Sequence, residues 1–326
     1  MFIRHKRRER KKVIEVTIPI ITIDNSYCVD ELMYVSALGV RNYRINPARI
    51  GIENALRLYT IMNDLVNGAK FFFDTAGSKE RISLSKTSQK EAEVLTTQND
   101  QRFFISKKMY DDICCGDTVR IRNGSHASRM VVKEKKCQKI RVEIESDDNI
   151  SLENNMHIYI SNRYIPNISL NYIDKKIIEI FKNLGTVCLS FSDSVELVRE
   201  AQDLVDGNTN IIAKIESPEG IKHAEEILNI CDGLIIGRDD LSIFYNYETI
   251  HNIVLQLSDV CLKHDKMLIP ASNYFLDLIS SHMIDEVNAK YIREVMKCAD
   301  YIYINETVIN KSKDFLWRVV NWFEKQ

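Results

Sequence analysis

The feature that most constrains the fold is a repeated alternation between short β-branched runs and longer segments with helical spacing. Apolar runs of this kind are typical of parallel strands that are buried on both faces. Eight runs are predicted as strands, at 13–23, 40–46, 70–74, 186–190, 210–215, 233–236, 267–270 and 301–304. Eight β/α units predict an α/β fold, a (β/α)₈ TIM barrel with its active site at the carboxyl ends of the strands.

The alternation stops between the third and fourth strands. Residues from about 83 to 163 carry polar loops and alternating runs such as 118–122 and 140–144, which are typical of a small antiparallel β module. We therefore expect a barrel domain formed by 1–82 and 164–326, and a β-rich lid domain, 83–163, inserted after the third strand. An open doubly wound sheet is the alternative, but no GxGxxG follows the first strand.

Composition excludes several classes of protein. The chain is 45% hydrophobic and 28% charged, as in globular proteins, and its net charge of -2 gives no field that attracts nucleic acid or an anionic membrane. The basic N-terminal run precedes no signal-peptide core, and 13–23 is too short to span a bilayer. The cysteines form no CxxC pair and are expected to be reduced. We expect a cytoplasmic protein without nucleic-acid or membrane partners.

Polar residues gather where the predicted strands end. They are Arg44, Asn46, Asp74, Thr75, Ser190, Lys214, Glu216, Arg238, Asp239, Asp240, Ser272 and Asn273. In a closed barrel all of them would face one mouth. The strand period of two places Lys214 and Glu216 on the same side, where an unpaired buried charge is costly. The two side chains are therefore expected to pair with each other or to bind a ligand.

The residue types at this mouth indicate anion and metal chemistry. Glu216 and Asp240 follow neighbouring strands, and two carboxylates with water and substrate oxygens suit Mg²⁺. Lys214 and the arginines match a phosphoryl or enolate anion. The alternative is an ion-pair layer that only closes the barrel, but stability residues concentrate at the opposite face.

These segments resemble the pyruvate kinase family over nearly the full chain. AKIESPEG is similar to the family's strand with a catalytic lysine and a metal-binding glutamate, and DGLIIGRDDLS to the next strand, which ends in a metal-binding aspartate. KMLIPASNYF, ADYIYINET, YRINPAR and FFDTAGSKERI resemble further strand-end segments of the family. The insert lies where the family places its lid domain.

The resemblance implies a role for each matching residue. Lys214 would stabilise the transferring phosphoryl group, and Glu216 and Asp240 would hold Mg²⁺ or Mn²⁺. Arg44 and Arg81 would contact phosphate.

Ser272 would supply the hydroxyl of the family's threonine, which helps to protonate the enolate. Arg238 and Asp239 would lie near the substrate carboxylate, although Asp239 replaces a glycine. Arg49, in place of a histidine, would lie toward the nucleotide.

The monovalent-cation region departs from the family pattern. Asn46, Asp74 and Thr75 are retained, whereas Ala48 stands in place of a serine and Lys79 in place of the usual glutamate. In family members with a lysine there, its ammonium replaces the potassium ion. We therefore expect Lys79 to supply this charge and K⁺ not to be required.

The resemblance implies a transferase that moves a phosphoryl group between phosphoenolpyruvate, or a related enol phosphate, and a nucleotide such as ATP. The family's C-terminal regulatory domain has no counterpart in this sequence, so no effector site is expected, and a homo-oligomer is considered. One alternative is a metal-dependent 2-oxo acid aldolase or lyase of the HpcH/HpaI type. Another is a catalytically weak relative that binds a metabolite or a protein.

Overall fold

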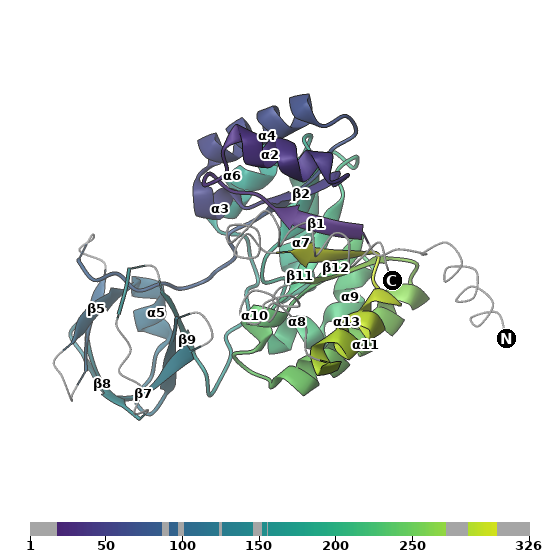
Figure 1. The fold of residues 1–326 in the computed structure, drawn as a ribbon. Helices are drawn as coiled ribbons and strands as arrows, with labels where there is room; N and C mark the ends of the chain where they lie inside the picture. Colours follow the sequence, from purple (N-terminus) through teal and green to yellow (C-terminus); the bar gives the residue numbers. More distant parts are fainter. Residues whose placement is uncertain are drawn as a thin grey trace. The chain divides into compact units, whose positions relative to one another are not determined.

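The structure is a computed structural model that describes residues 18–86, 91–96, 101–123, 126–145, 152–154, 156–271 and 286–304 (Figure 1). The chain divides into two compact units. Unit 1 comprises Met1–Gly77 and Pro166–Gln326, and unit 2 comprises Ser78–Ile165. Each unit is described by itself.

Unit 1 contains eight parallel strands within the described residues. They are β1 (Ile18–Thr22), β2 (Asn42–Ile45), β3 (Lys70–Asp74), β10 (Thr186–Leu189), β11 (Ile211–Ile215), β12 (Gly233–Gly237), β13 (Met267–Ala271) and β14 (Tyr301–Ile304), in the order β13-β12-β11-β10-β3-β2-β1-β14. The end strands also meet, because Asp300 N–H donates to Leu268 O at 3.0 Å and Asp300 Oδ2 accepts from Leu268 N at 3.0 Å. The sheet is therefore a nearly closed barrel, which confirms the predicted fold class.

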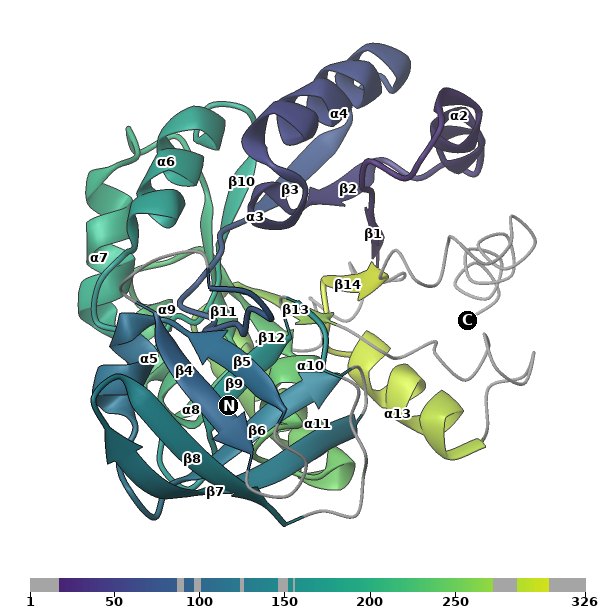
Figure 2. The same ribbon diagram turned by 90° about the vertical axis from the view of Figure 1, so that its left-hand side faces the viewer.

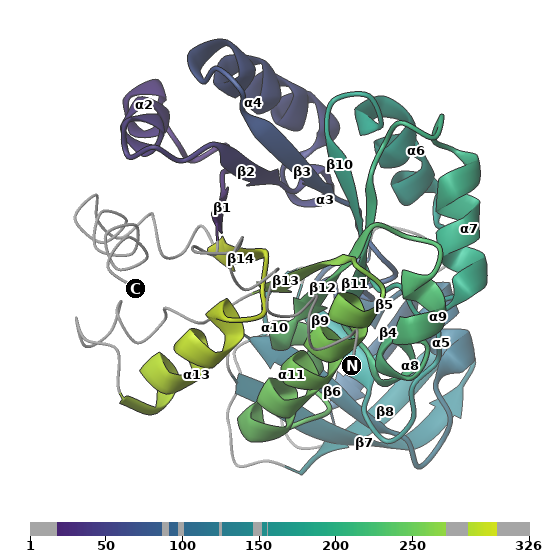
Figure 3. The same ribbon diagram turned by 90° about the vertical axis from the view of Figure 1, so that its right-hand side faces the viewer.

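Helices lie outside this barrel, as Figures 2 and 3 show. The described helices of unit 1 are α2 (Val29–Ala37), α3 (Pro47–Ile50), α4 (Ile52–Leu65), α6 (Tyr172–Phe181), α7 (Val195–Asp203), α8 (Pro218–Lys222), α9 (Ala224–Leu228), α10 (Arg238–Leu241), α11 (Tyr247–Lys263) and α13 (Glu286–Met296). None of the helices in the described ranges is both long and apolar enough to cross a membrane. The sequence also predicts a final helix over 307–325, and that range lies outside the described residues.

Alternation along the strands builds two apolar layers. In β11, Ile211, Ala213 and Ile215 pack against the helices, whereas Ile212 joins a smaller cluster inside the barrel with Phe72. Side chains two residues further along each strand point the same way. Lys214 is in phase with Ile212, so the barrel interior is where its side chain must go.

Polar caps begin the helices that follow the strands. Asn171 accepts from Asp174 N at the start of α6, at 2.9 Å, and Ser194 accepts from Leu197 N at the start of α7, at 3.2 Å. Ser217 accepts from Gly220 N at the start of α8, at 2.9 Å. Such caps satisfy N–H groups that have no partner within the helix. They therefore fix where each strand-end loop stops.

Unit 2 is a six-stranded sheet within the described residues. Its strands are β4 (Ala92–Thr96), β5 (Arg102–Ile105), β6 (Thr118–Asn123), β7 (His126–Lys136), β8 (Lys139–Ile144) and β9 (His157–Ile160), in the order β5-β4-β8-β7-β6-β9. All neighbours are antiparallel except β4 and β8. The sequence predicts no helix here, whereas the structure has α5 (Lys107–Asp112), capped by Ser106. A helix of six residues is too short to give a clear period.

Candidate active site

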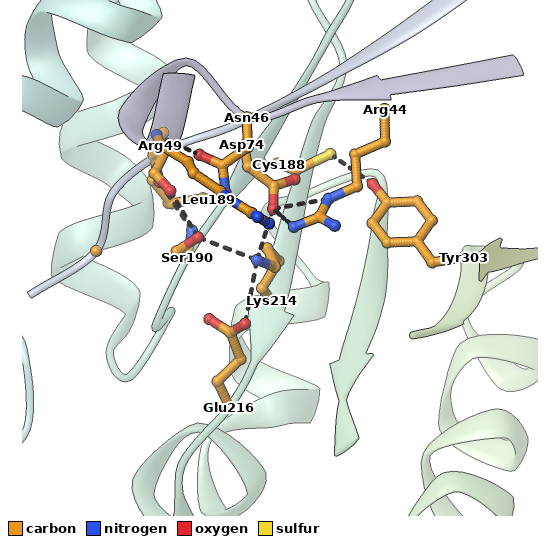
Figure 4. Close-up of polar contacts among 12 residues, drawn as sticks. Arg44, Asn46, Arg49, Asp74, Cys188, Leu189, Ser190, Lys214, Glu216 and Tyr303 are labelled. Atoms are coloured by element: carbon orange, nitrogen blue, oxygen red, sulfur yellow. Dashed lines mark hydrogen bonds and ion pairs between the residues drawn. The ribbon is translucent and has the colours of Figure 1, made fainter. Parts of the chain in front are cut away.

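Four charged side chains meet at the carboxyl ends of β2, β3 and β11 (Figure 4). Lys214 Nζ lies 2.9 Å from Asp74 Oδ2 and 3.1 Å from Glu216 Oε1. Arg44 donates to the same Asp74 oxygen through Nε at 3.1 Å and Nη2 at 2.7 Å. Lys214 and Glu216 therefore lie on one side of the strand.

Burial makes this cluster electrostatically strong. Asp74 is fully buried, and Lys214 and Glu216 are only 6% and 2% exposed. Burial alone would lower the pKa of Lys214, but the Asp74 and Glu216 carboxylates outweigh it and raise that pKa. Burial alone would raise the pKa of Asp74, but Arg44 and Lys214 hold it below its usual value. Arg44, Lys214 and Asp74 are thus charged at neutral pH, and the Asp74 carboxylate bonds to both cations.

The two oxygens of Asp74 differ in their surroundings. Oδ2 accepts from Arg44 and Lys214, whereas Oδ1 is buried and accepts no hydrogen bond from any described residue. Next to it, the Thr75 hydroxyl accepts from Ser190 N at 2.9 Å, and Asn46 Oδ1 accepts from Arg49 N at 3.1 Å. A buried carboxylate oxygen without a donor is costly, and a cation would satisfy it.

Three strand residues without a functional signal in the sequence surround the interior side of Arg44. Arg44 Nη1 donates to Thr22 Oγ1 at 3.1 Å, and its guanidinium lies 5.3 Å from the centroid of the Tyr303 ring. The Tyr303 hydroxyl in turn lies 3.2 Å from Cys188 Sγ. Thr22, Cys188 and Tyr303 look like ordinary strand residues, so only the closed barrel shows that they orient Arg44.

Glu216 lies against the end of β12. A Cβ atom added to Gly237 would lie 2.5 Å from Glu216 Cγ, so glycine is needed for this approach. Glu216 Oε2 also accepts from Phe191 N at 3.0 Å. The carboxylate is thereby brought beside the start of α10, where Asp240 is nearly buried.

The two residues predicted to lie near the substrate carboxylate, Arg238 and Asp239, are on the same helix. Arg238 is 4% exposed, and its guanidinium lies 4.3 Å from the centroid of the Tyr247 ring, a cation–π contact. Asp239 follows it and is half-buried. Arg238 therefore connects the start of α10 to α11.

The structure does not relate three other predicted site residues to this cluster. Ser272 is outside the described residues. Lys79 and Arg81 belong to unit 2, where Arg81 pairs with His157 in an isolated antiparallel bridge. Their proposed roles stay predictions. No group of three or more potential metal ligands occurs in the ranges that the structure describes.

Comparison with known proteins agrees with this geometry. The family model "Pyruvate kinase, barrel domain" matches residues 41–305. The chain belongs to the pyruvate kinase family. The matched range contains the whole cluster around Lys214, together with α10 and unit 2.

Individual relatives are distant in sequence. The pyruvate kinase of Borreliella burgdorferi is 24% identical over 291 residues, which cover 82% of this chain and 59% of the relative. That of Methylorubrum extorquens is 23% identical over 299 residues, 85% of this chain and 59% of the relative. That of Aeropyrum pernix is 28% identical over 165 residues, 47% of this chain and 34% of the relative. The chain thus spans 59% of the length of the first two relatives.

Proposed function

We propose that this chain is a pyruvate-kinase-like transferase that moves a phosphoryl group between phosphoenolpyruvate, or a related enol phosphate, and a nucleotide. The observation that carries the proposal is the Lys214 ammonium, buried between Asp74 and Glu216 and beside Arg44. Phosphoryl transfer needs positioned cations more than covalent chemistry from the protein.

Lys214 acts in this proposal as a fixed positive charge. Its Nζ atom points at Asp74, at Glu216 and, at 3.1 Å, at Ser190 Oγ, so the ammonium is oriented before substrate arrives. Because its pKa is raised, the amine keeps its proton and neutralises charge on the phosphoryl oxygens. Arg44, and Arg81 from unit 2, would contact the same phosphate.

Glu216 and Asp240 would hold Mg²⁺, or Mn²⁺, at the mouth. Two carboxylates at neighbouring strand ends, completed by water and substrate oxygens, fit the preference of Mg²⁺ for oxygen ligands. The close approach of Glu216 to Gly237 supports this fit, because it brings the carboxylate to α10. When bound, the ion would neutralise phosphate and enolate oxygens.

A second positive charge is proposed next to Asp74. The buried Oδ1 atom accepts no hydrogen bond from any described residue. The family resemblance assigns the monovalent-cation role to Asn46, Thr75 and Lys79, with the Lys79 ammonium as the cation, so the enzyme would not require K⁺. In the rest of the site, Arg238 and Asp239 would flank the substrate carboxylate and Arg49 the nucleotide. Ser272 would provide a hydroxyl near the enolate, and unit 2 would act as the lid of a cytoplasmic enzyme.

The decisive experiment measures pyruvate formation from phosphoenolpyruvate and ADP, with and without Mg²⁺. Lys214→Met should lower kcat by roughly 10²–10³-fold or more, the effect of losing a positioned charge. Lys222→Met is the matched control, because that lysine is 65% exposed and pairs with Glu219 on the same short helix, α8. Absence of turnover, combined with metal-dependent proton exchange on 2-oxo acids, would favour the aldolase-type alternative instead.

A further inference from the structure

The chain leaves unit 1 after Gly77 and returns to it at Pro166. We call the first point the outgoing crossing and the second the returning crossing. One loop in unit 1, Ser190–Asp193 after β10, contacts residues next to both. It also contacts both Lys214 and Glu216. We call it the β10 loop, and the contacts described below lie within unit 1.

The outgoing crossing packs on the first half of the β10 loop. Ser190 N donates to Thr75 Oγ1 at 2.9 Å, and Ser190 Oγ donates to Thr75 O at 2.8 Å. Gly77 has a φ of 64°, and an added Cβ would lie 2.9 Å from Phe191 Cδ2. This close approach requires glycine, so the outgoing segment has little freedom at this point.

The returning crossing is held by the last residue of the β10 loop. Asp193 is 1% exposed, and its Oδ2 atom accepts from Asn167 N at 2.9 Å and from Asn167 Nδ2 at 3.0 Å. Its other oxygen, Oδ1, accepts from the Ser217 hydroxyl. A single buried carboxylate therefore joins a residue next to the crossing to the residue that follows Glu216.

The middle of the β10 loop holds the site itself. Phe191 N donates to Glu216 Oε2 at 3.0 Å, and Ser192 N donates to Lys214 O at 3.1 Å. Phe191 has a φ of 51°, a conformation that is uncommon for a bulky residue. Strained backbone of this kind persists where its surroundings fix it, and here it presents an N–H to Glu216.

We propose that Asp193 is a positioning residue that couples the returning crossing at Asn167 to Glu216 through Ser217. Because both carboxylate oxygens are engaged and buried, a displacement of Asn167 moves Asp193 and, with it, Ser217. Glu216 precedes Ser217 and is also held by Phe191, so its carboxylate follows. The inference rests on the proposed function only in treating Glu216 as a metal ligand.

The test perturbs one end of this connection and reads the other end by amide hydrogen exchange in the full chain. Asn167→Ala should accelerate exchange at Phe191 and Gly220, and Ser217→Ala should accelerate it at Asn167, by about threefold or more in each case. Ser194→Ala is the matched control. It removes the neighbouring cap bond from Leu197 N and leaves the described bonds of the β10 loop in place. Acceleration confined to the substituted end in both variants would overturn the coupling.

Asn167→Ala also keeps the test valid if Ser217→Ala does not fold, because Asn167 is only half-buried. As a second readout, Mn²⁺ affinity should fall by about threefold or more in Asn167→Ala and stay unchanged in Ser194→Ala. Unchanged exchange at Phe191 and Gly220 in Asn167→Ala would again count against the coupling. A wild-type protein that binds no Mn²⁺ would refute the proposed function, while the exchange measurement would still decide the coupling.

Discussion

Replacing Asp74 by asparagine tests whether the buried charges stabilise one another. The side chain keeps its shape but loses its charge, so Arg44 and Lys214 are left with Glu216 as the carboxylate of the cluster. Leaving a buried charge without its partner costs about 3–5 kcal/mol. We therefore expect Asp74→Asn to lower the free energy of unfolding by about that amount.

A compensating substitution supplies the sharper test. Lys214→Met in the Asp74→Asn background restores the balance, with Arg44 and Glu216 remaining as one cation and one anion. The double variant should therefore be more stable than the sum of the two single effects predicts, by at least about 2 kcal/mol. The exposed pair Lys222 and Glu219 is the control, and its coupling should not exceed about 1 kcal/mol.

The measurement is urea unfolding at neutral pH for the wild type and the three variants. Circular dichroism and tryptophan fluorescence should give coincident transitions, because a free energy is defined only for two-state unfolding. Additive effects of Asp74→Asn and Lys214→Met, within about 0.5 kcal/mol, would refute the electrostatic reasoning. The short distances in the cluster would then reflect packing alone.

Three further outcomes are expected. Burial raises the pKa of Asp174 from 3.8 to about 6, so the folded state keeps a proton that the unfolded chain has released. The stabilisation from this proton is fully present below the pKa of the unfolded chain, 3.8, and is lost as pH rises through the pKa of the folded state, about 6. When pH falls from about 7 to about 4, the free energy of unfolding of the wild type should thus rise by up to roughly 3 kcal/mol relative to that of Asp174→Asn. Urea unfolding at several pH values measures this difference, and a difference that does not change with pH would contradict the prediction. Gly237→Ala should displace Glu216 and weaken Mn²⁺ binding, measured by calorimetry, by about tenfold or more, because the new Cβ overlaps Glu216 Cγ. Tyr247→Phe should preserve the stacking on Arg238, whereas Tyr247→Leu should lower thermal stability by about 0.5–2 kcal/mol, and equal effects of the two changes would exclude the cation–π contact.

The strands were predictable because their signal is local. Predicted and observed ranges coincide for β3 and β14, and the other strands of unit 1 lie within the predicted runs or extend one residue beyond them. Of the first predicted run, 13–23, residues 18–23 lie in the described part of the chain, and β1 covers Ile18–Thr22 there. The short helix α5 was missed, because six residues do not establish a helical period.

The candidate site was predictable only where it follows from strand direction. Parallel strands in a barrel bring their carboxyl ends together, which is why Lys214, Glu216 and Asp74 were selected. The sequence does not fix how these side chains pair, and the structure shows a network in which Asp74 bonds to both cations. Thr22 and Tyr303 gave no signal, because a threonine or a tyrosine in a strand is ordinary.

The sequence alone determined the order of the elements and the side of the strand on which Lys214 and Glu216 lie, since side-chain alternation depends only on neighbouring residues. Tertiary structure decided which groups meet across the barrel, such as Lys214 with Asp74, which is 140 positions away. It also decided the course of the β10 loop, where Phe191 adopts a positive φ and Asp193 joins Asn167 to Ser217. Contacts of this kind depend on how distant strands close on one another, and no local pattern of residues encodes that closure.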